Sequence, residues 1–293
     1  MNTKSAMITI AGRPNVGKST LTNYLVGEKI TIVSNKPQTT RNRICGIVTR
    51  DNLQFVFVDT PGYHRARTKL GDYMVSAVRE SIADVDATIL VVEPIVSVGA
   101  QEEALLEQLR GSRVILAINK IDTVEKDKLL EVIDVYAQTG AFDAIIPISA
   151  KTGDGVEELL RECEKYAVDS PFLFPEDVTT DQPEKQVMAE IIREKLLWCL
   201  EKEIPHGTAV EITRFTERDN GIIDLDATIY CEKASHKGII IGKQGAMLKK
   251  ISSLARQDCE RFMGTKVYLT TWVKVKENWR DSDFLVRNFG YRE

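Results

Sequence analysis

The sequence has 293 residues, of which 43% are hydrophobic and 28% are charged, and its net charge of −4 makes it mildly acidic. Such a chain is long and apolar enough for two domains with hydrophobic cores. Its longest apolar run, Ala87–Val92, is too short to cross a bilayer, and no signal-peptide pattern precedes it. The five cysteines include no C-x-x-C pair, which excludes the usual zinc spacings and fits reduced thiols. We therefore expect a cytoplasmic protein.

A glycine-rich loop follows the first apolar segment. Residues 7–11 are typical of a short buried strand, residues 19–26 are typical of a helix, and the loop between them has the pattern G-x-x-x-x-G-K-S. Backbone N–H groups of such a loop surround nucleotide phosphates, the lysine reaches the β- and γ-phosphates, and the serine hydroxyl coordinates Mg²⁺. The nucleotide-binding residues predicted here are Gly12, Arg13, Pro14, Asn15, Val16, Gly17, Lys18, Ser19 and Thr20.

Two later apolar strands end in motifs that read a guanine base. The run 114–118 precedes the pattern N-K-x-D, and the run 144–148 precedes S-A-K. The carboxylate of Asp122 can accept hydrogen bonds from guanine N1–H and N2–H₂, which adenine does not offer, so ATP would be rejected by a factor on the order of 10⁴–10⁵. The predicted base-binding residues are Asn119, Lys120, Asp122, Ser149, Ala150 and Lys151. The expected ligands are therefore GTP and GDP.

A third motif predicts a switch. The strand at 55–58 ends in the D-x-x-G motif, whose residues Asp59, Thr60, Pro61 and Gly62 we expect at the nucleotide. Asp59 would hold Mg²⁺ through a water, and the Gly62 N–H would contact the γ-phosphate, so the loop that follows would move after hydrolysis. The polar segment 36–41 supplies a second hydroxyl, for which Thr40 is preferred over Thr39. The predicted magnesium ligands are Ser19, Thr40 and Asp59.

The water-positioning glutamine of many small GTPases is absent, because Tyr63 follows Gly62. We therefore expect slow intrinsic hydrolysis, with Lys18, Asn15, Thr40 and Gly62 as the catalytic residues. Two interpretations of Asn15 stand side by side: it helps to hold a K⁺ ion beside the phosphates, or it only shapes the turn.

The second half of the chain predicts an RNA-binding module. Residues 240–245 read I-I-G-K-Q-G and precede an amphipathic helix, 246–263. With a helix at 186–202 and strands at 207–215, 222–231 and 266–276, the order α-β-β-α-α-β is that of a type II KH domain. Residues 233–276 hold ten Lys and Arg but two Asp and Glu, as expected of a surface that meets phosphates. The predicted RNA-binding residues are Lys237, Ile241, Gly242, Lys243, Gln244, Gly245, Lys249 and Lys250.

These patterns predict an α/β P-loop GTPase domain with a mostly parallel six-stranded sheet and helices on both faces, followed by a small α+β type II KH domain. The expected boundaries are 1–170 for the GTPase domain, 171–184 for a proline- and acid-rich linker and 185–293 for the KH domain. We expect a monomer.

The order of the motifs resembles the Era family of bacterial ribosome-assembly GTPases over nearly the full length. The similar segments are G-R-P-N-V-G-K-S-T at 12–20, Q-T-T-R at 38–41, D-T-P-G at 59–62, N-K-I-D at 119–122, S-A-K at 149–151, L-F-P-E-D at 173–177 and I-I-G-K-Q-G at 240–245. The resemblance implies binding near the 3′ end of 16S ribosomal RNA, a role in 30S subunit assembly, and peripheral contact with the inner face of the cell membrane.

Two other functions fit the sequence less well. An RNA-modifying GTPase would need a further catalytic domain or a cofactor motif, and neither is apparent in the sequence. A membrane-remodelling or signalling GTPase would use its KH-like domain for protein contacts, but the positive charge of residues 233–276 argues against it.

Overall fold

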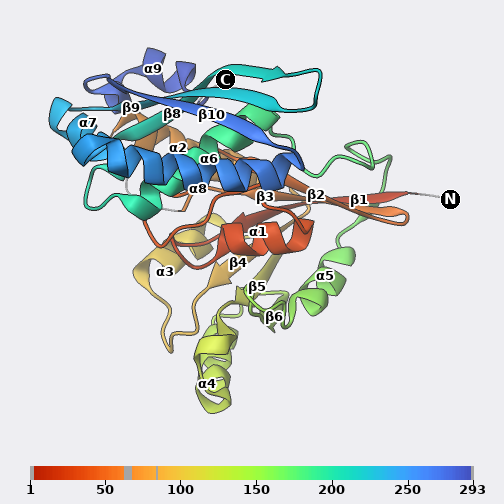
Figure 1. Ribbon diagram of the computed structural model, residues 1–293. Coiled ribbons are helices and arrows are strands. Elements are labelled where there is room, and N and C mark those ends of the chain that lie inside the picture. Colours follow the sequence, from red (N-terminus) through yellow and green to blue (C-terminus); the bar gives the residue numbers. More distant parts are fainter. Residues whose placement is uncertain (1–2, 63–67, 84, 292–293) are drawn as a thin grey trace. The chain divides into compact units, whose positions relative to one another are not determined.

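The computed structural model describes residues 3–62, 68–83 and 85–291. They form two compact units (Figure 1). The first unit comprises Met1–Thr31, Thr40–Arg65 and Met74–Asp181, and the second comprises Ile32–Thr39, Ala66–Tyr73 and Gln182–Glu293. Two short segments of the N-terminal half therefore belong to the second unit.

The first unit contains a sheet in the order β2-β3-β1-β4-β5-β6, in which all neighbours are parallel except the hairpin β2–β3. A two-residue strand, β7, pairs with the start of β1 as an addition to the six predicted strands. The strands are β1 (Lys4–Ala11), β2 (Ile44–Arg50), β3 (Leu53–Asp59), β4 (Ala87–Val92), β5 (Val114–Ile118), β6 (Ala144–Pro147) and β7 (Val168–Asp169). The predicted mostly parallel α/β sheet is confirmed.

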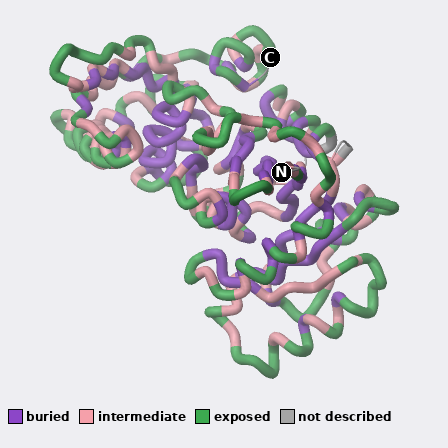
Figure 2. The backbone as a smooth tube through the Cα atoms, turned by 90° about the vertical axis from the view of Figure 1, so that its right-hand side faces the viewer, coloured by how far each residue is buried: buried purple, intermediate pink, exposed green. Residues whose placement is uncertain are grey.

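Helices cover both faces of this sheet. Helix α5 has buried apolar residues at 156, 159, 160 and 163, which form one stripe at helical spacing and pack with α1 on one face. Residues of α3 and α4 pack on the other face, while the outer sides of the helices stay exposed (Figure 2). The helices are α1 (Lys18–Val26), α2 (Lys69–Ala83), α3 (Ala100–Gln108), α4 (Lys126–Ala137) and α5 (Val156–Glu164).

The segment after β7 lies along the sheet as far as Asp181. The buried Gln54 side chain accepts hydrogen bonds from the N–H groups of Leu173 and Phe174, at 2.8 and 3.0 Å. On strand β2, the Ile47 N–H donates to the Thr179 carbonyl at 2.9 Å. The unpaired backbone of an edge strand needs such partners, so most of the predicted linker is structured as part of the first unit.

The second unit contains a three-stranded sheet in the order β10-β9-β8, with β8 antiparallel and β10 parallel to β9. Its elements are α6 (Glu184–Cys199), β8 (Thr208–Glu217), β9 (Ile223–Cys231), α7 (Ala234–Ile241), α8 (Ala246–Met263), β10 (Val267–Val275) and α9 (Asp283–Asn288). Alternate residues of β9 face the core formed with α6 and α8. The predicted α-β-β-α-α-β order is confirmed.

The C-terminal segment closes the core of this unit. Trp279 is fully buried, and its indole N–H donates to the Gly207 carbonyl at 2.9 Å. Its ring meets that of Phe289 edge to face, at 5.3 Å between centroids. Within the described ranges of the chain, no helix combines the length and apolarity needed to cross a membrane.

Candidate functional site

The glycine-rich loop lies between β1 and α1. Its backbone is left-handed at Asn15 and Gly17, with φ of 67° and 104°, and a Cβ at Gly17 would lie 2.2 Å from Nδ2 of Asn119. The Lys18 ammonium is buried and donates to the carbonyls of Gly12 and Arg13, at 3.1 and 2.9 Å. Burial lowers the pKa of Lys18 to about 8, against the opposing effect of the Asp59 carboxylate. A cation therefore lies inside the loop that the sequence assigns to phosphates.

Three side-chain oxygens converge beside this lysine. Ser19 Oγ donates to Asp59 Oδ2 at 2.8 Å and lies 2.8 Å from Thr40 Oγ1. The other oxygen of Asp59 is buried and has no hydrogen-bond partner within the described residues. Burial raises the pKa of Asp59 to about 6, although Lys18 opposes the shift. Hard oxygen ligands with an unused buried carboxylate oxygen fit Mg²⁺.

Thr39 differs from its neighbour Thr40. Its hydroxyl donates to the Lys36 carbonyl at 2.6 Å and pairs with the Ser34 hydroxyl at 2.7 Å. The hydroxyl of Thr40, by contrast, meets Ser19. The geometry therefore places Thr40, and not Thr39, among the oxygens of the candidate metal site.

The two base-reading motifs meet the phosphate loop at the carboxyl ends of β5 and β6. Asn119 donates to the Val16 carbonyl at 2.8 Å and accepts from the Ala150 N–H at 2.9 Å, so one amide joins three loops. The Ser149 hydroxyl donates to the exposed Asp122 carboxylate at 2.8 Å. In an open parallel sheet, this edge is where ligands bind.

The D-x-x-G motif lies against the phosphate loop. A Cβ at Gly62 would lie within 2.8–2.9 Å of three Pro14 atoms, so only glycine allows this approach. The Thr60 hydroxyl is buried and donates to the Ile10 carbonyl at 2.9 Å, which gives that side chain a role in the fold. Lys151 is exposed. Tyr63, the residue in place of the glutamine, lies outside the described residues.

The G-x-x-G loop joins α7 to α8 in the second unit. Lys243 and Gln244 at its centre are exposed, as are Lys249 and Lys250 in the first two turns of α8. None of these lysines forms an ion pair within the described residues, whereas both acidic residues of α8 pair with Lys or Arg. Lys237, in the middle of α7, and Ile241, at its end, are half-buried. This end of the unit therefore presents uncompensated positive charge.

Buried charges on α6 form a second feature, which the sequence did not predict. Arg193 is fully buried, donates to Glu190 Oε1 at 2.8 Å and donates to the Thr39 carbonyl. Glu194, also buried, accepts from the Val33 N–H at 2.8 Å. The sequence signal is four charged residues within 190–195, between the apolar residues 187–189 and 196–199 of the helix.

The C-terminal end of α6 also binds residues of the segment 32–39. Lys36 donates from its ammonium to the carbonyls of Leu197, at 2.5 Å, and Leu200. The Trp198 indole donates to the Val33 carbonyl at 2.9 Å. Residues 32–39, which precede Thr40, are thus bound to the first helix of the KH unit.

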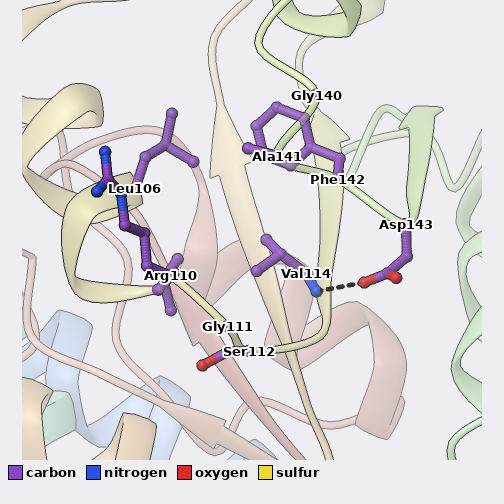
Figure 3. Close-up of a pocket in the computed structure, with 10 residues that line it drawn as sticks. Leu106, Arg110, Gly111, Ser112, Val114, Gly140, Ala141, Phe142 and Asp143 are labelled. Carbon is purple, nitrogen blue, oxygen red and sulfur yellow. Dashed lines mark hydrogen bonds between the residues drawn. The ribbon is translucent and has the colours of Figure 1, made fainter.

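A cavity of about 450 Å³ lies at the opposite end of the first sheet, near the amino ends of β5 and β6 (Figure 3). Its one carboxylate, Asp143, accepts a hydrogen bond from the Val114 N–H at 2.7 Å. None of the predicted nucleotide-binding residues lines it. We assign it no role in nucleotide binding.

Two family models match the chain. A model described as a 50S ribosome-binding GTPase matches residues 7–120, and a model described as a KH domain matches residues 203–280. The GTPase Era of Ruminiclostridium cellulolyticum is 52% identical over 294 residues, covering 100% of this chain and 99% of that protein. The GTPase Era of Clostridium kluyveri is 52% identical over 291 residues, covering 99% of each chain.

Two crystal structures are similar over the full length. A variant of Aquifex aeolicus Era bound to GDP and AlF₄⁻ has a TM-score of 0.94 at 35% identity, covering 99% of this chain and 100% of that chain. Era in complex with MgGDPNP and nucleotides 1506–1542 of 16S ribosomal RNA has a TM-score of 0.94 at 36% identity, with the same coverage.

Guanine-nucleotide motifs at one sheet edge and a G-x-x-G loop in a separate α+β unit define a P-loop GTPase with a KH domain. The identity of about one half extends over both units. The chain belongs to the Era family of GTPases. The resemblance, the fold class and the GTPase class expected from the sequence are confirmed.

Proposed function

We propose that this protein is a GTP-hydrolysing switch that binds 16S ribosomal RNA near its 3′ end and assists assembly of the 30S subunit. The observation that carries this proposal is the pairing of a guanine-nucleotide site with an uncompensated basic G-x-x-G loop in one chain. The similar Era complex with 16S ribosomal RNA nucleotides supports the RNA target.

In the proposed nucleotide site, each loop contacts a different part of the nucleotide. The backbone of residues 12–17 surrounds the phosphates, and the Lys18 ammonium exchanges its two carbonyl partners for the β- and γ-phosphates. Asp122 and the turn 149–151 read the base, while Asn119 holds their loops against the phosphate loop.

Mg²⁺ would be held by Ser19, Thr40 and Asp59, whose oxygens already converge. When bound, the ion neutralises charge on the phosphate oxygens. Asp59 can serve because its buried carboxylate has one oxygen without a partner within the described residues. The similar Era complex contains MgGDPNP, which supports this proposal.

Hydrolysis depends on charge placed at the phosphates, because the usual water-positioning side chain is absent. Lys18 supplies one positive charge, and the backbone N–H of Gly62, which packs closely against Pro14 of the phosphate loop, is the proposed contact for the γ-phosphate. Asn15, in its left-handed conformation, is the residue proposed to help hold K⁺. Turn geometry alone is the competing role of Asn15, and the rates of hydrolysis in KCl and in NaCl distinguish the two.

The RNA site comprises the G-x-x-G loop and the adjoining ends of α7 and α8. Lys243, Lys249 and Lys250 are exposed and would meet backbone phosphates, while the glycines let the strand approach closely. Binding should therefore weaken steeply with salt.

The five free cysteines support a reducing compartment, and we propose a cytoplasmic monomer with peripheral contact at the inner membrane face.

Residues 32–39 are proposed to connect the two sites. They are bound to α6 by Arg193, Glu194 and Lys36, and Thr40 follows them in the chain. A γ-phosphate that fixes Thr40 through Mg²⁺ therefore restrains a segment of the RNA-binding unit. By linkage, RNA would change GTP affinity by the same factor as GTP changes RNA affinity.

The proposal is tested with Lys243→Glu, which reverses a charge at the centre of the G-x-x-G loop. Affinity for an RNA of the 16S 3′-end sequence should fall at least about tenfold, and the slope of log affinity against log salt should become shallower. Lys128→Glu, an equal charge reversal at an exposed position of α4 in the first unit, is the matched control and should change neither. If both variants bind as the unmodified protein does, the assigned RNA surface is wrong.

A further inference from the structure

Two cations of the nucleotide motifs pair with carboxylates outside those motifs. Arg13, in the phosphate loop, forms an ion pair with Glu102, and its terminal nitrogen lies 3.6 Å from Glu93 Oε2. Lys120, in the base-reading motif, pairs with Glu93 Oε1 at 2.5 Å. Glu93 directly follows β4, and Glu102 lies in the first turn of α3. One chain of charges therefore connects both nucleotide loops to two further elements.

The Glu102 carboxylate is held in a defined place. Its side chain is 4% exposed, and a Cβ at Gly99 would lie 2.6 Å from its Oε2. Tyr136 packs nearby, where burial and then the charge of Glu102 raise its pKa to about 12, while Arg13 opposes the shift. A buried carboxylate is costly unless it is paired, and Glu102 lies in the first turn of α3 with Arg13 as its partner. The Arg13 guanidinium therefore lies beside a buried carboxylate.

The contacts of Lys120 hold the backbone of the phosphate loop at Asn15. Besides Glu93, the Lys120 ammonium donates to the Asn15 carbonyl at 2.8 Å. Asn15 has a φ of 67°, a conformation that costs free energy for a residue other than glycine. Glu93 thus holds Lys120 in the position from which it stabilises the strained turn.

We propose that Glu93 and Glu102 form a carboxylate clamp that holds the phosphate loop and the base-reading loop together and so sets the lifetime of bound guanine nucleotide. They are positioning residues, because they act through Arg13 and Lys120. The inference rests on the nucleotide-site residues proposed above. Release of nucleotide requires the two loops to separate, and a weakened clamp makes that separation easier.

The test uses Glu93→Gln and Glu102→Gln, which keep size but remove charge. Glu103→Gln is the matched control, because Glu103 is an exposed neighbour on the same turn of α3. Stopped-flow release of fluorescent GDP and of a fluorescent non-hydrolysable GTP analogue should become at least about fivefold faster in both clamp variants. KM for GTP should rise while kcat at saturating GTP stays within about twofold, because the clamp is expected to act on binding.

A double-mutant cycle shows whether the charges act together. The effects of Arg13→Gln and Glu102→Gln on the release rate should be less than additive. If Glu102→Gln fails to fold, Glu93→Gln decides, since the Glu93 side chain is 30% exposed and tolerates substitution more readily. Release rates equal to those of the unmodified protein, or an equal acceleration by Glu103→Gln, would overturn the clamp. If the unmodified protein does not bind guanine nucleotides at all, the nucleotide-site assignment on which the clamp rests is wrong.

Discussion

Lys36→Met should weaken the connection between nucleotide and RNA without touching either proposed binding surface. Lys36 is half-buried and donates from its ammonium to two carbonyls at the C-terminal end of α6, those of Leu197 and Leu200. Methionine keeps most of the apolar stem but removes the charge and both hydrogen bonds. The segment 32–39 should then bind α6 less tightly.

The size of the effect follows from the number and environment of these bonds. A hydrogen bond from a charged donor contributes about 1.5–3 kcal/mol, and a cation at a helix C-terminus about 0.3–1 kcal/mol. Because water can replace part of both interactions at a half-buried site, we expect a net loss of about 1–2 kcal/mol, a factor of about 5–30 in an equilibrium constant. The ratio of RNA affinities in the GTP-analogue and GDP states should fall toward one by up to that factor.

The assay is fluorescence anisotropy of a labelled RNA of the 16S 3′-end sequence, titrated in each nucleotide state at fixed salt. Lys128→Met, which removes an exposed lysine from α4, controls for the loss of one charge. An affinity ratio in Lys36→Met equal to that of the unmodified protein would refute the idea that residues 32–39 transmit the nucleotide state.

Three further outcomes follow from the nucleotide site. Asp122→Asn should lower GTP affinity by about 10²-fold or more and admit xanthosine triphosphate, whose 2-carbonyl accepts from the new amide; competition binding with both nucleotides measures this. Lys18→Ala should slow turnover by at least about 10²-fold, measured as phosphate release at saturating GTP, and near-normal turnover would remove the lysine from the mechanism. If Asn15 helps to hold K⁺, hydrolysis should be faster in KCl than in NaCl at equal ionic strength, and Asn15→Ala should erase the difference. Equal rates in the two salts would leave Asn15 with its role in the turn alone.

The sequence is sufficient to predict those elements that are defined by a short, continuous run of residues. A phosphate loop needs a strand, glycines, a lysine and a helix in immediate succession, so its residues and its place could be read together. The two base-reading motifs follow apolar strands, and the carboxyl ends of parallel strands share one edge of the sheet. The choice of Thr40 depended only on where one polar segment enters the site, and the structure places its hydroxyl beside Ser19.

Features that depend on pairing across the chain were not predictable in this way. Nothing local in residues 32–39 indicates that they bind α6, because their partners, Arg193 and Glu194, lie more than 150 positions later. The expected linker reads as polar and proline-rich, yet Gln54 of β3 provides hydrogen bonds that order it. Glu93 and Glu102 belong to no motif, and only the folded loops bring them to Arg13.

The proposed switch is tested most directly by the affinity of the unmodified protein for an RNA containing nucleotides 1506–1542 of 16S ribosomal RNA, the segment in the similar Era complex. The affinity is measured at fixed salt with a non-hydrolysable GTP analogue, with GDP and without nucleotide. We expect the tightest RNA binding with the analogue. By linkage, RNA should raise the affinity for the analogue by the same factor as the analogue raises the affinity for RNA. Three identical affinities would show two independent modules on one chain and would contradict the proposed switch.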